Sequence, residues 1–168
     1  RILHGSSNNQ GTHALSLNTI SNLISTGTGG LVIGISAGAT TVPTLNVNTN
    51  TITGLSTTGA SAAVIGLQIV TGATVNANSN IINTITGTGT TDPIAAGITV
   101  AAGTTVNVGY NNIHTINQNS IITTATGPVI IGLLFTGGVN VTAHNNFVAN
   151  LNAANTAYQD AIRGISVN

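Results

Sequence analysis

Two stretches of the sequence that lie 31 residues apart share one pattern. Residues 74–85 read TVNANSNIINTI, and residues 105–116 read TVNVGYNNIHTI. Apolar residues occupy the second and fourth positions of both stretches, asparagine the seventh, and isoleucine the ninth and twelfth. The alternation before the shared asparagine is typical of a β-strand with one buried face. A pattern that returns after about 31 residues indicates a repeat protein.

The same pattern extends over most of the chain. Five asparagines are each followed by apolar residues two and five positions later, at spacings of 32, 30, 31 and 35 residues: Asn18, Asn50, Asn80, Asn111 and Asn146. Five glycines are each followed by apolar residues one and three positions later, at spacings of 32, 31, 35 and 32 residues: Gly34, Gly66, Gly97, Gly132 and Gly164. Because two independent sets of residues keep one period, the whole chain is built from the repeat.

Each repeat contains three short alternating segments, one across the glycine, one before the asparagine and one after it. Thr, Val and Ile favour strands, whereas Asn and Gly are common at corners. Three strands per ~31 residues describe one coil of a parallel β-solenoid, and crossover chirality favours a right-handed coil. We therefore predict an all-β protein in which residues 1–168 form one domain. This domain is a right-handed parallel β-helix of about five coils of ~31 residues, with three short strands per coil.

Equivalent residues of such a coil stack on one another every ~4.8 Å. The repeated asparagines are predicted to form a ladder at a corner, because Asn tolerates the left-handed backbone conformation and its amide can bond the amides above and below. The apolar positions are predicted to fill a dry interior as two columns, which are Ile20, Ile52, Ile82, Ile113 and Val148, and Leu23, Leu55, Ile85, Ile116 and Leu151.

The composition excludes several classes of protein. Only two basic and two acidic residues are present, so there is no basic patch to bind nucleic acid. The longest apolar run is about eight residues, too short for membrane insertion as a helix. The absence of cysteine excludes a disulfide framework and thiolate metal sites. With 41% hydrophobic residues the chain nevertheless has ample material for a core.

Catalysis is not expected. General acid/base and glycosidic chemistry require paired carboxylates, but Asp92 and Asp160 are two repeats apart at corners, where turn formation explains them. The four histidines are scattered over different strands without the spacing of metal ligands: His4, His13, His114 and His144. We therefore predict a protein that is not an enzyme and that uses no cofactor and no metal.

The repeat resembles a known group of proteins. Its cadence of Asn-x-Ile-x-x-Ile, Gly-Ile/Leu-x-Val and Gly-Ala/Thr-Thr-Val-Asn is similar to that of the right-handed β-helix, or β-strand-repeat, proteins of bacterial cell surfaces. The resemblance covers the chain from about residue 15 to residue 167. It implies export and an extracellular or cell-surface location. It implies no active site, because such repeats occur in adhesins, secreted lyases and structural proteins alike.

Self-assembly is the function that the sequence favours. The ends of a solenoid are rows of unpaired strand edges, which proteins normally cap or guard with charge, and neither end of this chain shows a capping segment. Counting back along the repeat places His4 at the first glycine position, so that Arg1 lies three positions before it. We expect a head-to-tail homopolymer, a filament or surface layer, whose subunit junction involves Arg1, Asp160 and Arg163.

A flat polar face offers an alternative function. The strand before each ladder asparagine places threonine beside asparagine on its outward side, which gives the columns Thr12, Thr44, Thr74 and Thr105, and Asn46, Asn76 and Asn107. Such a face suits binding to a glycan, as in an adhesin, or to ice. Ice binders are known for Thr-x-Thr ladders, however, whereas this face is Thr-x-Asn. Outward strand positions in a charge-poor secreted protein would also favour these two residue types.

Overall fold

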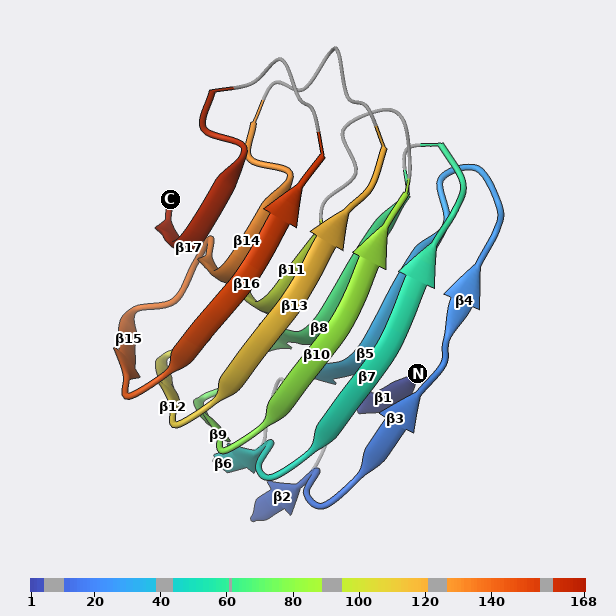
Figure 1. Ribbon diagram of the computed structural model, residues 1–168. Helices are drawn as coiled ribbons and strands as arrows, with labels where there is room; N and C mark the ends of the chain where they lie inside the picture. The colour runs from blue at the N-terminus through green and yellow to red at the C-terminus, as the bar shows by residue number, and fades with distance from the viewer. Residues whose placement is uncertain (5–10, 39–43, 61, 89–94, 121–126, 155–158) are drawn as a thin grey trace.

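The computed structural model describes residues 1–4, 11–38, 44–60, 62–88, 95–120, 127–154 and 159–168. The described residues form strands without any helix, and the strands pair in parallel into three sheets (Figure 1). Sheet A consists of β1 (Ile2–His4), β5 (Leu31–Gly38), β8 (Ala63–Thr71), β11 (Ala95–Val100), β14 (Ile130–Phe135) and β17 (Ile162–Val167).

The other two sheets are built in the same way. Sheet B consists of β2 (Thr12–Ala14), β6 (Thr44–Asn46), β9 (Thr74–Asn78), β12 (Thr105–Gly109) and β15 (Asn140–His144). Sheet C consists of β3 (Thr19–Ser21), β7 (Thr51–Thr57), β10 (Ile81–Gly87), β13 (Asn112–Gln118) and β16 (Phe147–Ala153), with the short β4 (Ile24–Ser25) also pairing with β7.

The chain visits the sheets in the order A, B, C and then starts the next coil. In Figure 1 it rises through sheet C at the front, crosses to sheet A behind, descends and returns through sheet B, while it advances from β3 towards β16. This sense of rotation and advance makes a right-handed coil. Equivalent residues are about 32 positions apart, so the predicted right-handed, all-β solenoid with three strands per coil is confirmed.

The predicted interior is also confirmed. The isoleucines Ile52, Ile82 and Ile113 lie opposite one another in sheet C and are completely buried. Leu55, Ile85 and Ile116 form the second buried column, and the members of both columns at the outermost coils pack against this core. The dry interior therefore lies between the three sheets and continues from coil to coil.

The left-handed backbone conformation does not lie where we predicted it. The ladder asparagines themselves have ordinary φ angles; the residue just before each of them has a positive φ instead, between 52° and 62°. These residues all point into solvent: Leu17, Thr49, Ser79, Tyr110 and Asn145. The left-handed residue turns the chain sharply from sheet B to sheet C, and the asparagine that follows can then direct its amide inward.

The register of the first coil also corrects the prediction. Ile2 lies opposite Ile35 and His4 opposite Ala37, so Arg1 rather than His4 occupies the glycine position. Counting back failed because the connection from sheet A to sheet B is longer in the first coils. Eight positions separate His4 from Thr12, whereas five separate Ile69 from Thr74.

The glycine column allows sheet A to approach the core closely. A Cβ atom on Gly97 would lie 2.5 Å from Cγ2 of Ile113 and 2.6 Å from the carbonyl oxygen of Gly132 in the next coil. Gly34, Gly66 and Gly132 are in equally tight surroundings. Gly164 is the exception, because a Cβ atom there would have no neighbour within 4 Å.

Gly97→Ala should therefore destabilise the protein by about 1–3 kcal/mol, because the side chain of Ile113 and the carbonyl group of Gly132 would both have to move away from the added methyl group. Gly164→Ala is the matched control in the same column and should leave stability within about 0.5 kcal/mol of the parent. Chemical denaturation followed by circular dichroism measures both. Equal stabilities of the two variants would show that sheet A does not approach the core as described.

Candidate functional site

One pair of hydrogen bonds joins the ladder asparagines of neighbouring coils. The Oδ1 atom of Asn80 accepts from the backbone N–H and from the side-chain Nδ2 of Asn50, both at 3.0 Å. Asn111 accepts from Asn80 in the same way, both at 2.9 Å. The pair recurs from Asn18 to Asn50 at 3.0 and 2.9 Å and from Asn111 to Asn146 at 3.1 and 2.9 Å. The predicted side-chain ladder is therefore present at every step.

From Asn50 onward, the second N–H of each ladder side chain points back to the previous coil. Nδ2 of Asn80 donates to the carbonyl oxygen of Val47 at 2.9 Å, and Nδ2 of Asn50 donates to that of Leu15 at 2.8 Å. Each inner amide thus bridges three coils, and the three inner asparagines are no more than 1% exposed. Burying an amide is costly unless its hydrogen bonds are made, and here the stacking of equivalent coils makes them.

The ladder has a direction, so its two ends differ. Every step donates from the earlier asparagine to the later one. At the C-terminal end, the backbone N–H of Asn146 and one N–H of its side chain have no acceptor among the described residues, since Nδ2 makes its one bond to Val108. At the N-terminal end, Oδ1 of Asn18 has no donor in the described part of the chain, and Nδ2 makes a local bond to Ser16 instead.

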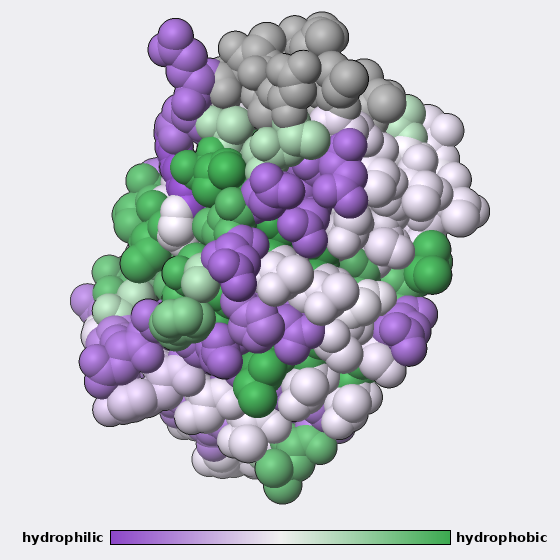
Figure 2. Space-filling model, viewed as in Figure 1, coloured by the Kyte–Doolittle hydropathy of each residue, from purple (hydrophilic) through white to green (hydrophobic). Residues whose placement is uncertain are grey.

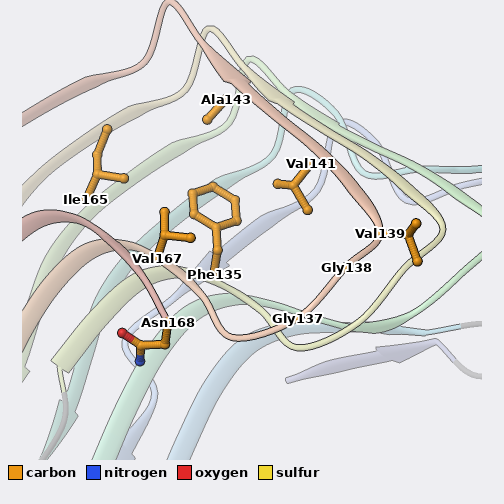
Figure 3. A pocket seen from close by; sticks show the side chains of 9 residues that line it. All are labelled: Phe135, Gly137, Gly138, Val139, Val141, Ala143, Ile165, Val167 and Asn168. Carbon is orange, nitrogen blue, oxygen red and sulfur yellow. The ribbon is translucent and has the colours of Figure 1, made fainter.

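The C-terminal end of the solenoid exposes its apolar interior. The outermost strands there are β15, β16 and β17, each paired on one side only within the described residues. A hollow of about 280 Å³ lies beside β14, β15 and β17 and is lined by Phe135, Val141, Ile165 and Val167, among others (Figure 3). Val167 is 77% and Ile165 56% exposed, and hydrophobic side chains gather on this side of the molecule in Figure 2.

A pair of histidines that was not predicted from the sequence lies at the N-terminal end. Nε2 of His4 lies 2.8 Å from Nδ1 of His13, and the two rings are nearly perpendicular. The register places His4 in the inward column of Ala37 and His13 in that of Leu45. Correct alignment of the first coil would have predicted the pair, because both histidines then fall on core positions.

The three residues predicted at the subunit junction lie at opposite ends of the chain. Asp160 and Arg163 form an ion pair, with Nε of Arg163 2.8 Å from Oδ2 of Asp160. The hydrogen bond from Arg163 lowers the pKa of the Asp160 carboxyl from its usual value. Arg163 also donates to the hydroxyl of Ser166 at 2.9 Å. Arg1 is exposed beside β1, at the other end of the solenoid (Figure 1).

The predicted polar face lies on sheet B, where its two columns stand in register. The threonines pair from Thr12 to Thr105 and the asparagines from Asn46 to Asn107, until β15 replaces them with Asn140 and Thr142. The asparagines bond one another along the column: Nδ2 of Asn76 to Oδ1 of Asn46 at 2.9 Å, and Nδ2 of Asn107 to Oδ1 of Asn76 at 2.8 Å. Part of each amide is therefore already used within the protein.

Other kinds of site receive no support from the described residues. They contain no group of three His, Cys, Asp or Glu side chains that could hold a metal ion. They also contain no helix with the length and hydropathy needed to cross a bilayer. Asp92 lies outside the described residues.

Fold and ladder together define this chain as a parallel β-solenoid repeat protein. Comparisons with protein-family models, with curated proteins and with solved structures find no match to it.

Asn80→Ala should lower the free energy of unfolding by about 1–3 kcal/mol, because it leaves two buried donors of Asn50 and the carbonyl oxygen of Val47 without their partner. Asn76→Ala is the matched control: it removes an amide of the same kind from a half-exposed column where water can replace it, and should cost no more than about 0.5 kcal/mol. Urea denaturation measures both values. A loss at Asn80 no greater than that at Asn76 would contradict a structural role for the buried ladder.

Proposed function

We propose that this chain is a non-catalytic structural protein that assembles head-to-tail with copies of itself into a filament or surface layer. One observation carries the proposal: all three sheets end in strands that are paired on one side only, at both ends of the described solenoid. Exposed strand edges pair readily with other chains unless they are covered or charged. Contact between two different ends is heterologous, and such contacts build open assemblies.

The surface of the chain adds to this argument. The exposed apolar side chains concentrate at the ends, with Leu3 and Leu17 at one end and Val139, Ile165 and Val167 at the other. The formal net charge is zero at pH 7, so long-range repulsion between copies is weak, which favours association. Stacking would continue the interior of one copy into that of the next.

The cellular setting rests on the resemblance of the repeat to cell-surface β-helix proteins. An extracellular or cell-surface location agrees with a surface made of hydroxyl and amide groups. The junction predicted from the sequence brings Arg1 of one copy to Asp160 of another. It requires β1 of the second copy to stack on β17 of the first, and Arg1 would then join the existing pair of Asp160 and Arg163.

Binding to a glycan or to ice through sheet B is the second candidate. Its support is the in-register Thr and Asn columns, whose members repeat at the strand spacing of ~4.8 Å. The Asn76 and Asn107 amides bond within the column, so fewer of their groups are available to a ligand. Only a few rungs carry the pattern, because β15 departs from it.

Val167→Asp tests the assembly. Val167 is 77% exposed, so the variant should fold, yet it would place a charge in the apolar contact between copies. We expect the parent to form concentration-dependent oligomers in sedimentation velocity and fibres or sheets in electron microscopy, and the variant to remain monomeric. A parent that stays monomeric at high concentration, or a variant that assembles like the parent, would contradict the proposal.

Thr74→Lys is the matched control on the polar face. It should leave assembly unchanged, because Thr74 lies on β9, the middle strand of sheet B, away from both ends of the solenoid. If sheet B instead binds a ligand, this variant should lose affinity for insoluble polysaccharide or thermal hysteresis activity that the parent displays. Ligand binding by a monomeric parent, lost in Thr74→Lys and kept in Val167→Asp, would favour the second candidate over the first.

A further inference from the structure

The two ends of the ladder are chemically complementary. Asn146 presents two N–H donors without acceptors, and Asn18 presents one Oδ1 atom without a donor, among the described residues. Inside the chain, each step of the ladder consists of two such donors and one such acceptor. Asn18 of a second copy can therefore continue the ladder of the first with the same pair of hydrogen bonds.

Continuing the ladder creates a conflict in sheet A. If Asn18 stacks on Asn146, then β2 and β3 of the second copy lie on β15 and β16 of the first. The position for β1 of the second copy would then be the next one beyond β14. That position already holds β17, the sixth strand of sheet A. Either β1 of the second copy or β17 of the first therefore has to be displaced.

Resting on the proposed head-to-tail assembly, we infer that β17 of one copy displaces β1 of the next and pairs with its β5. The columns of sheet A fix the register: Ile165 is in the column of Ile35 and Val167 in that of Ala37. The same columns bring Ile162 to Val32. By contrast, β1 reaches only Ile35–Ala37 of β5.

The exchange gives more contact than it removes. It costs the three-residue pairing of β1, the hydrogen bond between His4 and His13, and the contact of Nδ1 of His4 with the carbonyl oxygen of Gly38 at 3.3 Å. In return, the exposed side chains of Ile165 and Val167 become buried in the places of Ile2 and His4. The hollow at the C-terminal end is covered by β2 and β3 of the second copy, and Leu15 continues the column of Ala143.

A junction in which β1 of the second copy stacks on β17 of the first leaves a gap instead. If β1 of the second copy stacks on β17, sheet A continues, but sheets B and C each lack one strand between the copies. The hollow beside Val141 then stays open. Only the exchange continues all three sheets and the ladder, with main-chain hydrogen bonds supplying affinity as in other strand additions.

Cysteine crosslinking distinguishes the two junctions, because the natural chain contains no cysteine. Ala14 and Thr142 are both exposed members of one column of sheet B. In the exchange, Ala14→Cys of one copy lies one strand spacing, ~4.8 Å, from Thr142→Cys of the other, which is within the range for a disulfide. In the alternative junction the separation is about twice as large, and Leu3→Cys lies beside Ser166→Cys instead.

The single variants are mixed in equal amounts, oxidised mildly and separated on a denaturing gel. The exchange predicts a covalent heterodimer from Ala14→Cys with Thr142→Cys, none from either variant alone, and none from Leu3→Cys with Ser166→Cys. Crosslinking of only the latter pair, in a protein that still sediments as an oligomer, would overturn the exchange and leave head-to-tail assembly intact. Absence of oligomers in sedimentation would overturn both.

Deletion of residues 1–4 provides an independent measurement. The deleted strand is the one that the exchange displaces, so its removal should let the chain assemble at a several-fold lower concentration. If β1 instead forms the junction by stacking on β17, the deletion should weaken assembly. A several-fold higher concentration requirement would therefore overturn the inference.

Discussion

The fold depends on one repeated interaction, the double hydrogen bond from each ladder asparagine to the Oδ1 atom of the next. A buried amide tolerates no slip of register, because a shifted coil would leave its donors unpaired in a dry interior. The ladder thus fixes how each coil lies on the one before. With the register fixed, isoleucine stacks on isoleucine and glycine on glycine, and these columns form the buried interior. The chain forms this interior although it contains few charged residues.

The repeat made much of this predictable. Asn80 and Ile82 could be assigned to the ladder and the core because stacking gives equivalent residues equivalent surroundings. Two features escaped the pattern. The left-handed residues that precede the ladder asparagines, such as Ser79 and Tyr110, share no side-chain chemistry, since their conformation is set by the turn that places the next asparagine. His4 was assigned to the wrong column because the first coil has a longer connection from sheet A to sheet B. Counting back by a fixed number of residues does not allow for this extra length.

The same asparagine side chain has two different roles in this protein. In the ladder it is buried and bonded on all sides, and it specifies register. In the column of Asn46, Asn76 and Asn107 it is half-exposed and bonded along one direction, so it contributes mainly a polar surface. Because the buried ladder has a direction, the two ends of the solenoid present opposite hydrogen-bonding groups. The proposed association of unlike ends would use the same interaction that holds the coils together.

Native-state hydrogen exchange, measured by NMR on the monomeric variant Val167→Asp, tests this account most directly. The backbone N–H groups of Asn50, Asn80 and Asn111 each donate to the side-chain oxygen of the next ladder asparagine. They should exchange only by global unfolding, as slowly as the amides of the central core strands. The N–H of Asn146, at the open end of the ladder, should exchange orders of magnitude faster. Fast exchange at Asn80 and Asn111, at the rate of Asn146, would contradict a ladder that fixes the register of the coils.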